Sequence, residues 1–179
     1  MEIDMLAGLR DVSLSAVTRD DAEGYACGEA IALPAAVKLR RAWSGSWRDT
    51  YGDDGARRRV RAAAGVEAEL RLAGVDPGRL VALGLWAGGG EDGVFSDGLP
   101  LGGRGYALRF AARTLNGDAF HCEYRVFWVE DIRLDDCVSR GEAPGVCEWI
   151  ISGTLRRPRC GLYAWRVTRV ANPSGFSAP

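Results

Sequence analysis

Two runs in the first half of the chain alternate between apolar and polar side chains, as a strand with one buried face does. The first run, residues 37–43, has apolar side chains at Val37, Leu39 and Trp43. The second run, residues 66–72, has charged residues on one face and apolar residues on the other. The apolar face consists of Val66, Ala68, Leu70 and Leu72. The alternation therefore predicts two strands.

The segment between these strands, residues 44–59, reads SGSWRDTYGDDGARRR. It is too long for a tight hairpin turn. It is also too rich in aromatic residues and paired charges for an idle linker. We therefore predict a projecting hairpin arm.

A short helix is predicted directly after the second strand, at about residues 76–86. Asp76 is an N-cap residue and Pro77 suits the first helical position. Leu80, Leu83 and Gly84 then fall on one face of the helix.

The rest of the first half shows shorter alternations separated by turn signals. They predict strands at residues 12–16 and 25–33, with a polar turn at residues 19–24 between them. Pro34 ends the second of these strands because proline cannot donate to a sheet ladder.

The second half begins with a glycine-rich loop, residues 88–105, which we expect to be flexible or ordered only by a partner. A hairpin with Asn116-Gly117 at its turn follows. Its return strand is expected to bury Phe120, Cys122, Tyr124, Val126 and Trp128, and to turn His121, Glu123 and Arg125 outward. The remaining predictions are a strand at 106–112, a polar crossing at 131–145, a strand at 147–155, a turn at 158–161 and a strand at 163–167.

About eight strands and one helix indicate a mainly β fold. The expected architecture is a β-sandwich or partly closed barrel with one short flanking α-helix and the long hairpin arm. We predict a single domain over residues 1–170 and a flexible C-terminal tail over residues 171–179.

Composition and charge exclude several classes of function. The chain has 47% hydrophobic and 26% charged residues, which fits one soluble domain. Its 23 basic and 24 acidic residues nearly cancel, so no overall field attracts nucleic acid or an acidic membrane. No signal peptide or membrane span is expected. Five widely spaced cysteines favour reduced thiols in a cytoplasm: Cys27, Cys122, Cys137, Cys147 and Cys160.

Candidate chemistry is sparse, and we expect no enzyme, no metal and no cofactor. The single histidine, His121, has Glu123 two positions on, but both fit an exposed sheet face. The cysteines lack metal-ligand spacing. Three aspartate pairs could be metal carboxylates, but adjacent side chains of an extended segment point apart. They are Asp20-Asp21, Asp53-Asp54 and Asp135-Asp136.

The one basic cluster lies on the predicted arm, at Arg57, Arg58, Arg59 and Arg61. It lacks the wider basic surface that nucleic-acid binding needs. Because Asp53 and Asp54 precede it closely, we interpret it as half of an ionic contact with a neighbouring copy of the chain.

Several of these segments, in this order, resemble the tail tube (major tail) protein family of long-tailed bacteriophages, and most closely the branch of siphophages of Gram-positive hosts and related prophages. The resemblance covers nearly the whole chain and lies in order and spacing. The similar segments are GLRDV near the start, the turn at residues 16–21, the arm motif YGDDG at residues 51–55, the short helix, and Gly153-Thr154 in a late strand.

The resemblance implies a β-sandwich subunit that forms hexameric rings, which stack into the tail tube of the virion. Double-stranded DNA passes through the lumen without sequence-specific binding. Implied partners are other copies of the chain and the tape-measure, tail-tip and tail-terminator proteins, with assembly in the host cytoplasm and no membrane. The arm bridges successive rings, and its expected contact residues are Trp47, Tyr51, Asp53, Asp54, Arg57, Arg58 and Arg59.

Two other classes of function remain open from the sequence. A ligand-binding β-barrel would use the inward aromatic side chains to line a pocket. A small β-barrel enzyme would need convergent titratable groups, for which one outward histidine is a poor start.

Overall fold

The computed structural model describes residues 6–44, 47–51, 57–61, 65–74, 76–86, 103–114, 119–135 and 148–170. Ten strands and one short helix lie in these ranges, and the predicted mainly β fold is confirmed. The helix is α1 (Pro77–Ala82). The strands are β1 (Leu6–Asp21), β2 (Gly24–Ala32), β3 (Ala36–Ser44), β4 (Trp47–Tyr51), β5 (Arg57–Arg61), β6 (Gly65–Leu72), β7 (Arg104–Thr114), β8 (Ala119–Leu134), β9 (Trp149–Arg156) and β10 (Trp165–Arg169).

Eight of the strands form one antiparallel sheet in the order β2-β1-β7-β8-β9-β6-β3, and β10 pairs with β8. Strand β8 is long enough to pair with different strands along one edge, β10 and then β9. Its first part pairs with β10 over Phe120–Tyr124, and its second part pairs with β9 over Val126–Leu134. Among the described residues β2 and β3 each have one sheet partner, so the sheet stays open and does not close into a barrel.

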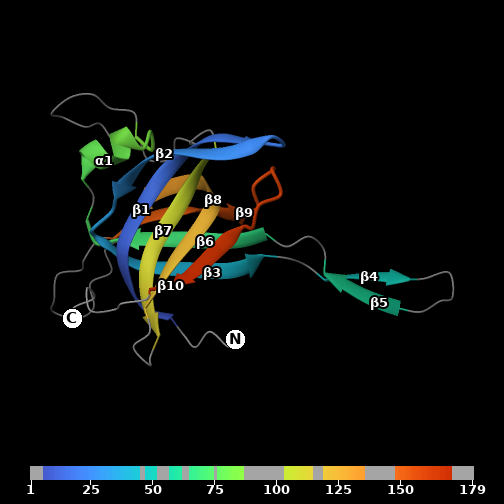
Figure 1. Cartoon of the computed structure of the whole chain (residues 1–179). Coiled ribbons are helices and arrows are strands. Elements are labelled where there is room, and N and C mark those ends of the chain that lie inside the picture. The colour runs from blue at the N-terminus through green and yellow to red at the C-terminus, as the bar shows by residue number, and fades with distance from the viewer. Residues whose placement is uncertain are drawn as a thin grey trace, which may run out of the picture.

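The sheet curls so that its two halves face each other (Figure 1). Strands β1 and β7 cross over β6 and β3, and β1 contacts β3 although the two are not hydrogen-bonded neighbours. Bending one continuous sheet in this way lets β6, β7, β8 and β9 bury side chains against one another without a second sheet.

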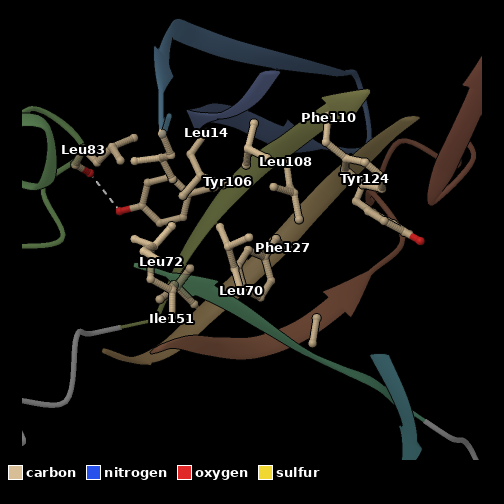
Figure 2. Close-up of a cluster of buried hydrophobic side chains, with 14 of the residues drawn as sticks. Leu14, Leu70, Leu72, Leu83, Tyr106, Leu108, Phe110, Tyr124, Phe127 and Ile151 are labelled. Carbon is tan, nitrogen blue, oxygen red and sulfur yellow. Dashed lines mark hydrogen bonds between the residues drawn. The ribbon is translucent and has the colours of Figure 1, made fainter. Parts of the chain in front are cut away.

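The hydrophobic core fills the space between the two halves (Figure 2). Tyr106 and Leu108 from β7 meet Leu70 from β6 and Ile151 from β9, and each of these side chains is fully buried. The Tyr106 hydroxyl donates a hydrogen bond of 2.8 Å to the carbonyl oxygen of Leu83, which satisfies the one polar atom of the ring.

The alternation in β8 changes phase in mid-strand, so one part of the predicted core is wrong. Phe120, Cys122, Tyr124 and Val126 are buried as predicted, but the next buried residues are Phe127 and Val129. Trp128 is half-buried outside, with the Arg156 guanidinium 4.5 Å from its ring centre. The β7–β8 register shifts between Tyr106 and Leu108, near the point where β8 changes partner from β10 to β9. Such an irregularity moves the following side chains to the other face.

The first turn is shorter than the predicted 19–24. Strand β1 continues to Asp21 and β2 begins at Gly24. The Asp21 carboxylate accepts hydrogen bonds of 2.9 Å from the backbone N–H groups of Glu23 and Gly24, and this local cap allows the chain to reverse within two residues.

Other strand boundaries also differ from the prediction, beginning with β1, which starts at Leu6 rather than at residue 12. Strand β8 runs to Leu134, into the predicted crossing, because residues 131–134 pair with β9. Strand β7 begins at Arg104, inside the predicted glycine-rich loop. Strand β10 begins at Trp165, and Tyr163 before it is exposed. Asn116-Gly117, Cys137, Cys147, residues 87–102 of the loop and the tail 171–179 lie outside the described residues.

The helix begins where the sequence predicts and ends sooner. The Asp76 carboxylate accepts a 2.9 Å hydrogen bond from the Gly78 N–H, and Pro77 is the first helical residue. Gly84 has φ +66°, the left-handed conformation that ends a helix. The helix therefore stops at Ala82 rather than near residue 86, with Leu80 and Leu83 buried as predicted.

Candidate subunit interface

The predicted hairpin arm is an antiparallel strand pair, β4 and β5, that forms a separate two-stranded sheet. Figure 1 shows this pair standing beyond the ends of β3 and β6, from which the chain enters and leaves it. The arm extends to Arg61, two residues past the predicted end at 59. A strand pair that stands apart from the main sheet in this way is available to another molecule.

The register of the arm places most of the predicted contact residues. Trp47 lies opposite Arg61 near the sheet, and Tyr51 lies opposite Arg57 at the far end of the paired strands. Arg58 and Arg59 lie opposite Thr50 and Asp49. Asp53 and Asp54 lie outside the described residues.

The β3–β6 ribbon connects the arm to a groove at its other end. The arm joins where Ser44 lies opposite Gly65, whereas the groove begins where Ala36 lies opposite Leu72. The groove has a volume of about 260 Å³. It is lined by Leu33, Pro34, Ala35, Leu72, Gly74, Asp76, Arg79 and Leu80. Its lining comes from the β2–β3 corner, the end of β6 and α1, so no single stretch of sequence signals it.

The end strands of the curled sheet are a second candidate contact. Strands β2 and β3 pair only with β1 and β6, so each has an edge without a sheet partner in the described part of the chain. Such edges offer backbone donors and acceptors to another strand.

Charged side chains on the outer face of β6 pair within the subunit. Arg71 lies 2.9 Å from Asp135 and 3.2 Å from Glu148, and the hydrogen bond to Glu148 is the main cause that raises the Arg71 pKa. Arg133 on β8 lies 3.7 Å from Glu69 of β6 and 2.8 Å from Asp131 of its own strand. These groups are therefore neutralised locally and add little field beyond the subunit.

The aspartates considered as metal ligands have other partners where the structure describes them. Asp20 accepts a 2.7 Å hydrogen bond from the Arg159 N–H, and Asp21 pairs with Arg19 at 2.8 Å. Over the described ranges, no group of three or more His, Cys, Asp or Glu residues is arranged to hold a metal ion.

An open groove of about 260 Å³ lies beside His121 and is lined by residues of β1, β7, β8 and β10. Two carboxylates line this groove, Asp11 and Glu123. Glu123 lies 2.9 Å from Arg109, and Arg109 also donates to the Ser15 hydroxyl at 3.1 Å. The neighbouring thiol of Cys122 is directed into the core, where burial raises its pKa. A buried thiol held protonated is a poor nucleophile.

Two aromatic clusters were not predicted, because each joins residues distant in sequence. The Tyr25 hydroxyl donates to the Arg125 carbonyl oxygen, and the Cys27 thiol lies 3.0 Å from that hydroxyl. Burial, followed by the hydrogen bond with Cys27, raises the Tyr25 pKa. In the second cluster Arg41 donates to the Tyr124 hydroxyl, and Tyr124 stacks on Trp165 with ring centres 6.2 Å apart. Both clusters fasten strands from different parts of the sheet.

These features define a mainly β protein with one open, curled antiparallel sheet, a projecting hairpin arm and an apolar groove at the opposite end of the arm's supporting strands. None of the helices among the described residues has the length and apolar character of a membrane span. No protein-family model matches the chain, and a search of curated proteins finds no relative of it.

Proposed function

We propose that this chain is a structural subunit of a phage tail tube, which forms hexameric rings that stack into the conduit for DNA. The observation that carries the proposal is the arm, a strand pair that forms its own sheet and stands beyond the ends of β3 and β6. Building such an arm orders backbone at a cost of about 1–2 kcal/mol per residue. Contacts with another molecule can offset that cost.

A tube grows in two directions, around each ring and from one ring to the next. The two candidate contacts, the edges of β2 and β3 and the arm, supply one contact for each direction. Unpartnered edges at β2 and β3 can join neighbouring copies around a ring. The arm extends beyond the sheet and can reach a copy in the next ring. Head-to-tail contacts close into rings when the rotation closes, and otherwise continue as open stacks.

The charge distribution suits a conduit. The formal net charge is −1, and many of the surface charges described above are paired within the subunit. A strongly basic lumen would hold DNA, which carries one negative charge per about 1.7 Å of axis, whereas a near-neutral one lets it pass.

The sheet interior offers less support to a ligand-binding barrel. The space between the two halves is filled by large side chains, among them Tyr106, Phe127 and Leu70, all fully buried (Figure 2). Binding a small molecule there would require the core to open.

Replacement of the arm tests the proposal. Ser44 and Gly65 lie opposite each other in the ladder, so a short Gly-Ser turn can join them in place of residues 45–64. We expect this variant to fold, because the core lies elsewhere, and to form no tubes in the presence of the tail-tip complex. Negative-stain microscopy measures tube length, and circular dichroism checks the fold.

A matched control exchanges Ala22-Glu23, the exposed β1–β2 turn, for Asn-Gly and should form tubes of normal length. Tubes of normal length from the armless variant would disprove the role of the arm. If the unaltered chain forms neither rings nor tubes with the tail-tip complex, the proposed function itself is wrong.

A further inference from the structure

The groove at the far end of the β3–β6 ribbon has a fixed shape. The corner that forms one wall is closed by a 3.1 Å hydrogen bond from the Ala36 N–H to the Leu33 carbonyl. The Ala35 carbonyl accepts a 2.8 Å hydrogen bond from the Ala73 N–H, which ties this wall to the end of β6. A groove held by backbone bonds is preorganised for an occupant.

The helix side of the groove is equally well anchored. Arg79 lies 3.1 Å from the Asp76 carboxylate and donates a 2.5 Å hydrogen bond to the Ala32 carbonyl at the end of β2. This side chain therefore joins α1 to the sheet. The Asp76 side chain remains 57% exposed, so the carboxylate at the rim can accept a further partner.

The chemistry of the groove suits a single side chain. Leu33, Leu72 and Leu80 line it and are nearly fully buried, whereas Val37 and Val81 on the flanking elements are 49% and 42% exposed. Sites for small molecules usually have volumes of about 300–1,000 Å³. At about 260 Å³ the groove lies below that range and fits an aromatic side chain.

We propose that this groove, lined by Leu33, Pro34, Ala35, Leu72, Asp76 and Leu80, receives the far end of the arm of a second copy of the chain. The occupant is Tyr51, whose ring suits the apolar walls. Arg57, opposite Tyr51 in the arm, complements the Asp76 carboxylate at the rim. This inference rests on the proposed function and names the surface that the arm contacts.

The topology supports this occupant. The arm and the groove lie at opposite ends of the same two strands, so a copy shifted along the ribbon directs its arm toward the groove of the next copy. The five residues of β4 span about 16 Å at about 3.3 Å per residue, which carries Tyr51 well clear of its own sheet. Because each copy gives its arm to one neighbour and receives the arm of another at this groove, the contact repeats without limit.

Filling the groove is the first test. The half-buried Ala35 lines it, and Ala35→Trp places an indole where Tyr51 of the neighbour would enter. We expect this variant to keep its fold and to lose tubes. The matched control is Ala22→Trp, the same exchange at the exposed β1–β2 turn, which should form normal tubes.

Cross-linking tests the contact directly with a smaller change. A chain with both Tyr51→Cys and Ala35→Cys should form disulfide-linked ladders in assembled tubes on non-reducing gels. Each single variant retains the native cysteines and serves as its control. Mixing the two single variants should give linked dimers, which shows that the bond joins different copies.

The outcomes separate this inference from the proposed function. Normal tubes from Ala35→Trp, or assembled double-cysteine tubes without ladders, overturn the inference and leave the proposed function standing. Ladders from Ala35→Cys alone would mean that another segment fills the groove, and they overturn it as well. If the unaltered chain forms neither rings nor tubes with the tail-tip complex, the inference falls together with the proposed function.

Discussion

Two fully buried polar side chains, those of Tyr106 and Ser15, have specific hydrogen-bond partners. The Tyr106 side chain is fully buried and its hydroxyl reaches the Leu83 carbonyl. Ser15, also fully buried, accepts a hydrogen bond from Arg109. Leaving a buried carbonyl without its donor costs about 1–3 kcal/mol, so these residues specify which strands and loops meet.

Buried phenols predict a loss of stability at high pH. Burial raises the pKa of Tyr25, Tyr106 and Tyr124, so the folded state keeps protons that the unfolded chain releases near pH 10. Their contribution to the free energy of unfolding is complete below pH 10 and is lost as the pH rises above it, by up to about 1.4 kcal/mol per pH unit for each phenol. Urea unfolding between pH 8 and pH 11.5 measures this decline.

The variant Tyr106→Phe separates two roles of the Tyr106 hydroxyl, its hydrogen bond to Leu83 and its ionisation at high pH. At pH 8 it should be less stable by about 1–3 kcal/mol, because the Leu83 carbonyl loses its donor. Above pH 10 its stability should fall less steeply than that of the unaltered chain. An equally steep fall would contradict the assignment. The control is Tyr163→Phe, the same exchange at an exposed tyrosine, which should leave the free energy of unfolding at pH 8 unchanged.

At the scale of elements, close contact between β8 and β9 depends on a residue without a side chain. A Cβ atom at Gly153 would lie 2.0 Å from the carbonyl oxygen of Trp128 and 2.9 Å from the Cα of Val129. The register between the two strands shifts at this place. The atoms nearest to this Cβ position belong to the backbone of β8 and not to a flexible side chain. A side chain at residue 153 would therefore require one of the two strands to move.

The variant Gly153→Ala should therefore be less stable by about 1–3 kcal/mol, because the added methyl forces β8 and β9 apart. Thermal unfolding measures the change. The control is Gly28→Ala on β2, where a Cβ would lie 3.7 Å from its nearest neighbour, the Ala16 carbonyl oxygen. Equal unfolding temperatures for Gly153→Ala and Gly28→Ala would refute the contact.

At the scale of the whole molecule, the candidate contacts lie on different elements. The edges of β2 and β3 belong to the curled sheet, whereas the arm is a sheet of its own. Under the proposed function, ring closure and ring stacking should then be separable. The armless chain keeps all of β2 and β3 up to Ser44.

We therefore expect the armless variant to form single rings at high protein concentration while it fails to stack, because the edge strands remain available. Mass photometry should give a discrete oligomer, and negative-stain images should show rings without tubes. A variant that stays monomeric when the unaltered chain forms rings would place the ring contact on the arm instead.

The sequence by itself determined the elements that rest on local physics. The alternation at Val66, Ala68, Leu70 and Leu72 predicted β6, because side chains of a strand point to opposite faces in turn. Asp76 and Pro77 predicted where α1 begins, since capping involves neighbouring residues only. The length and composition of residues 44–59 predicted the arm, which needs no distant contact to form a hairpin.

Only the tertiary structure decided the features that depend on contacts between residues far apart in the sequence. Phe127 rather than Trp128 entered the core because β8 changes partner from β10 to β9, and no local pattern reports that change. Strand β8 extended to Leu134 because β9 lies beside it. The groove required Pro34, Leu72 and Leu80 to meet from three segments. Such placement follows from how the sheet curls, which is a property of all its strands together.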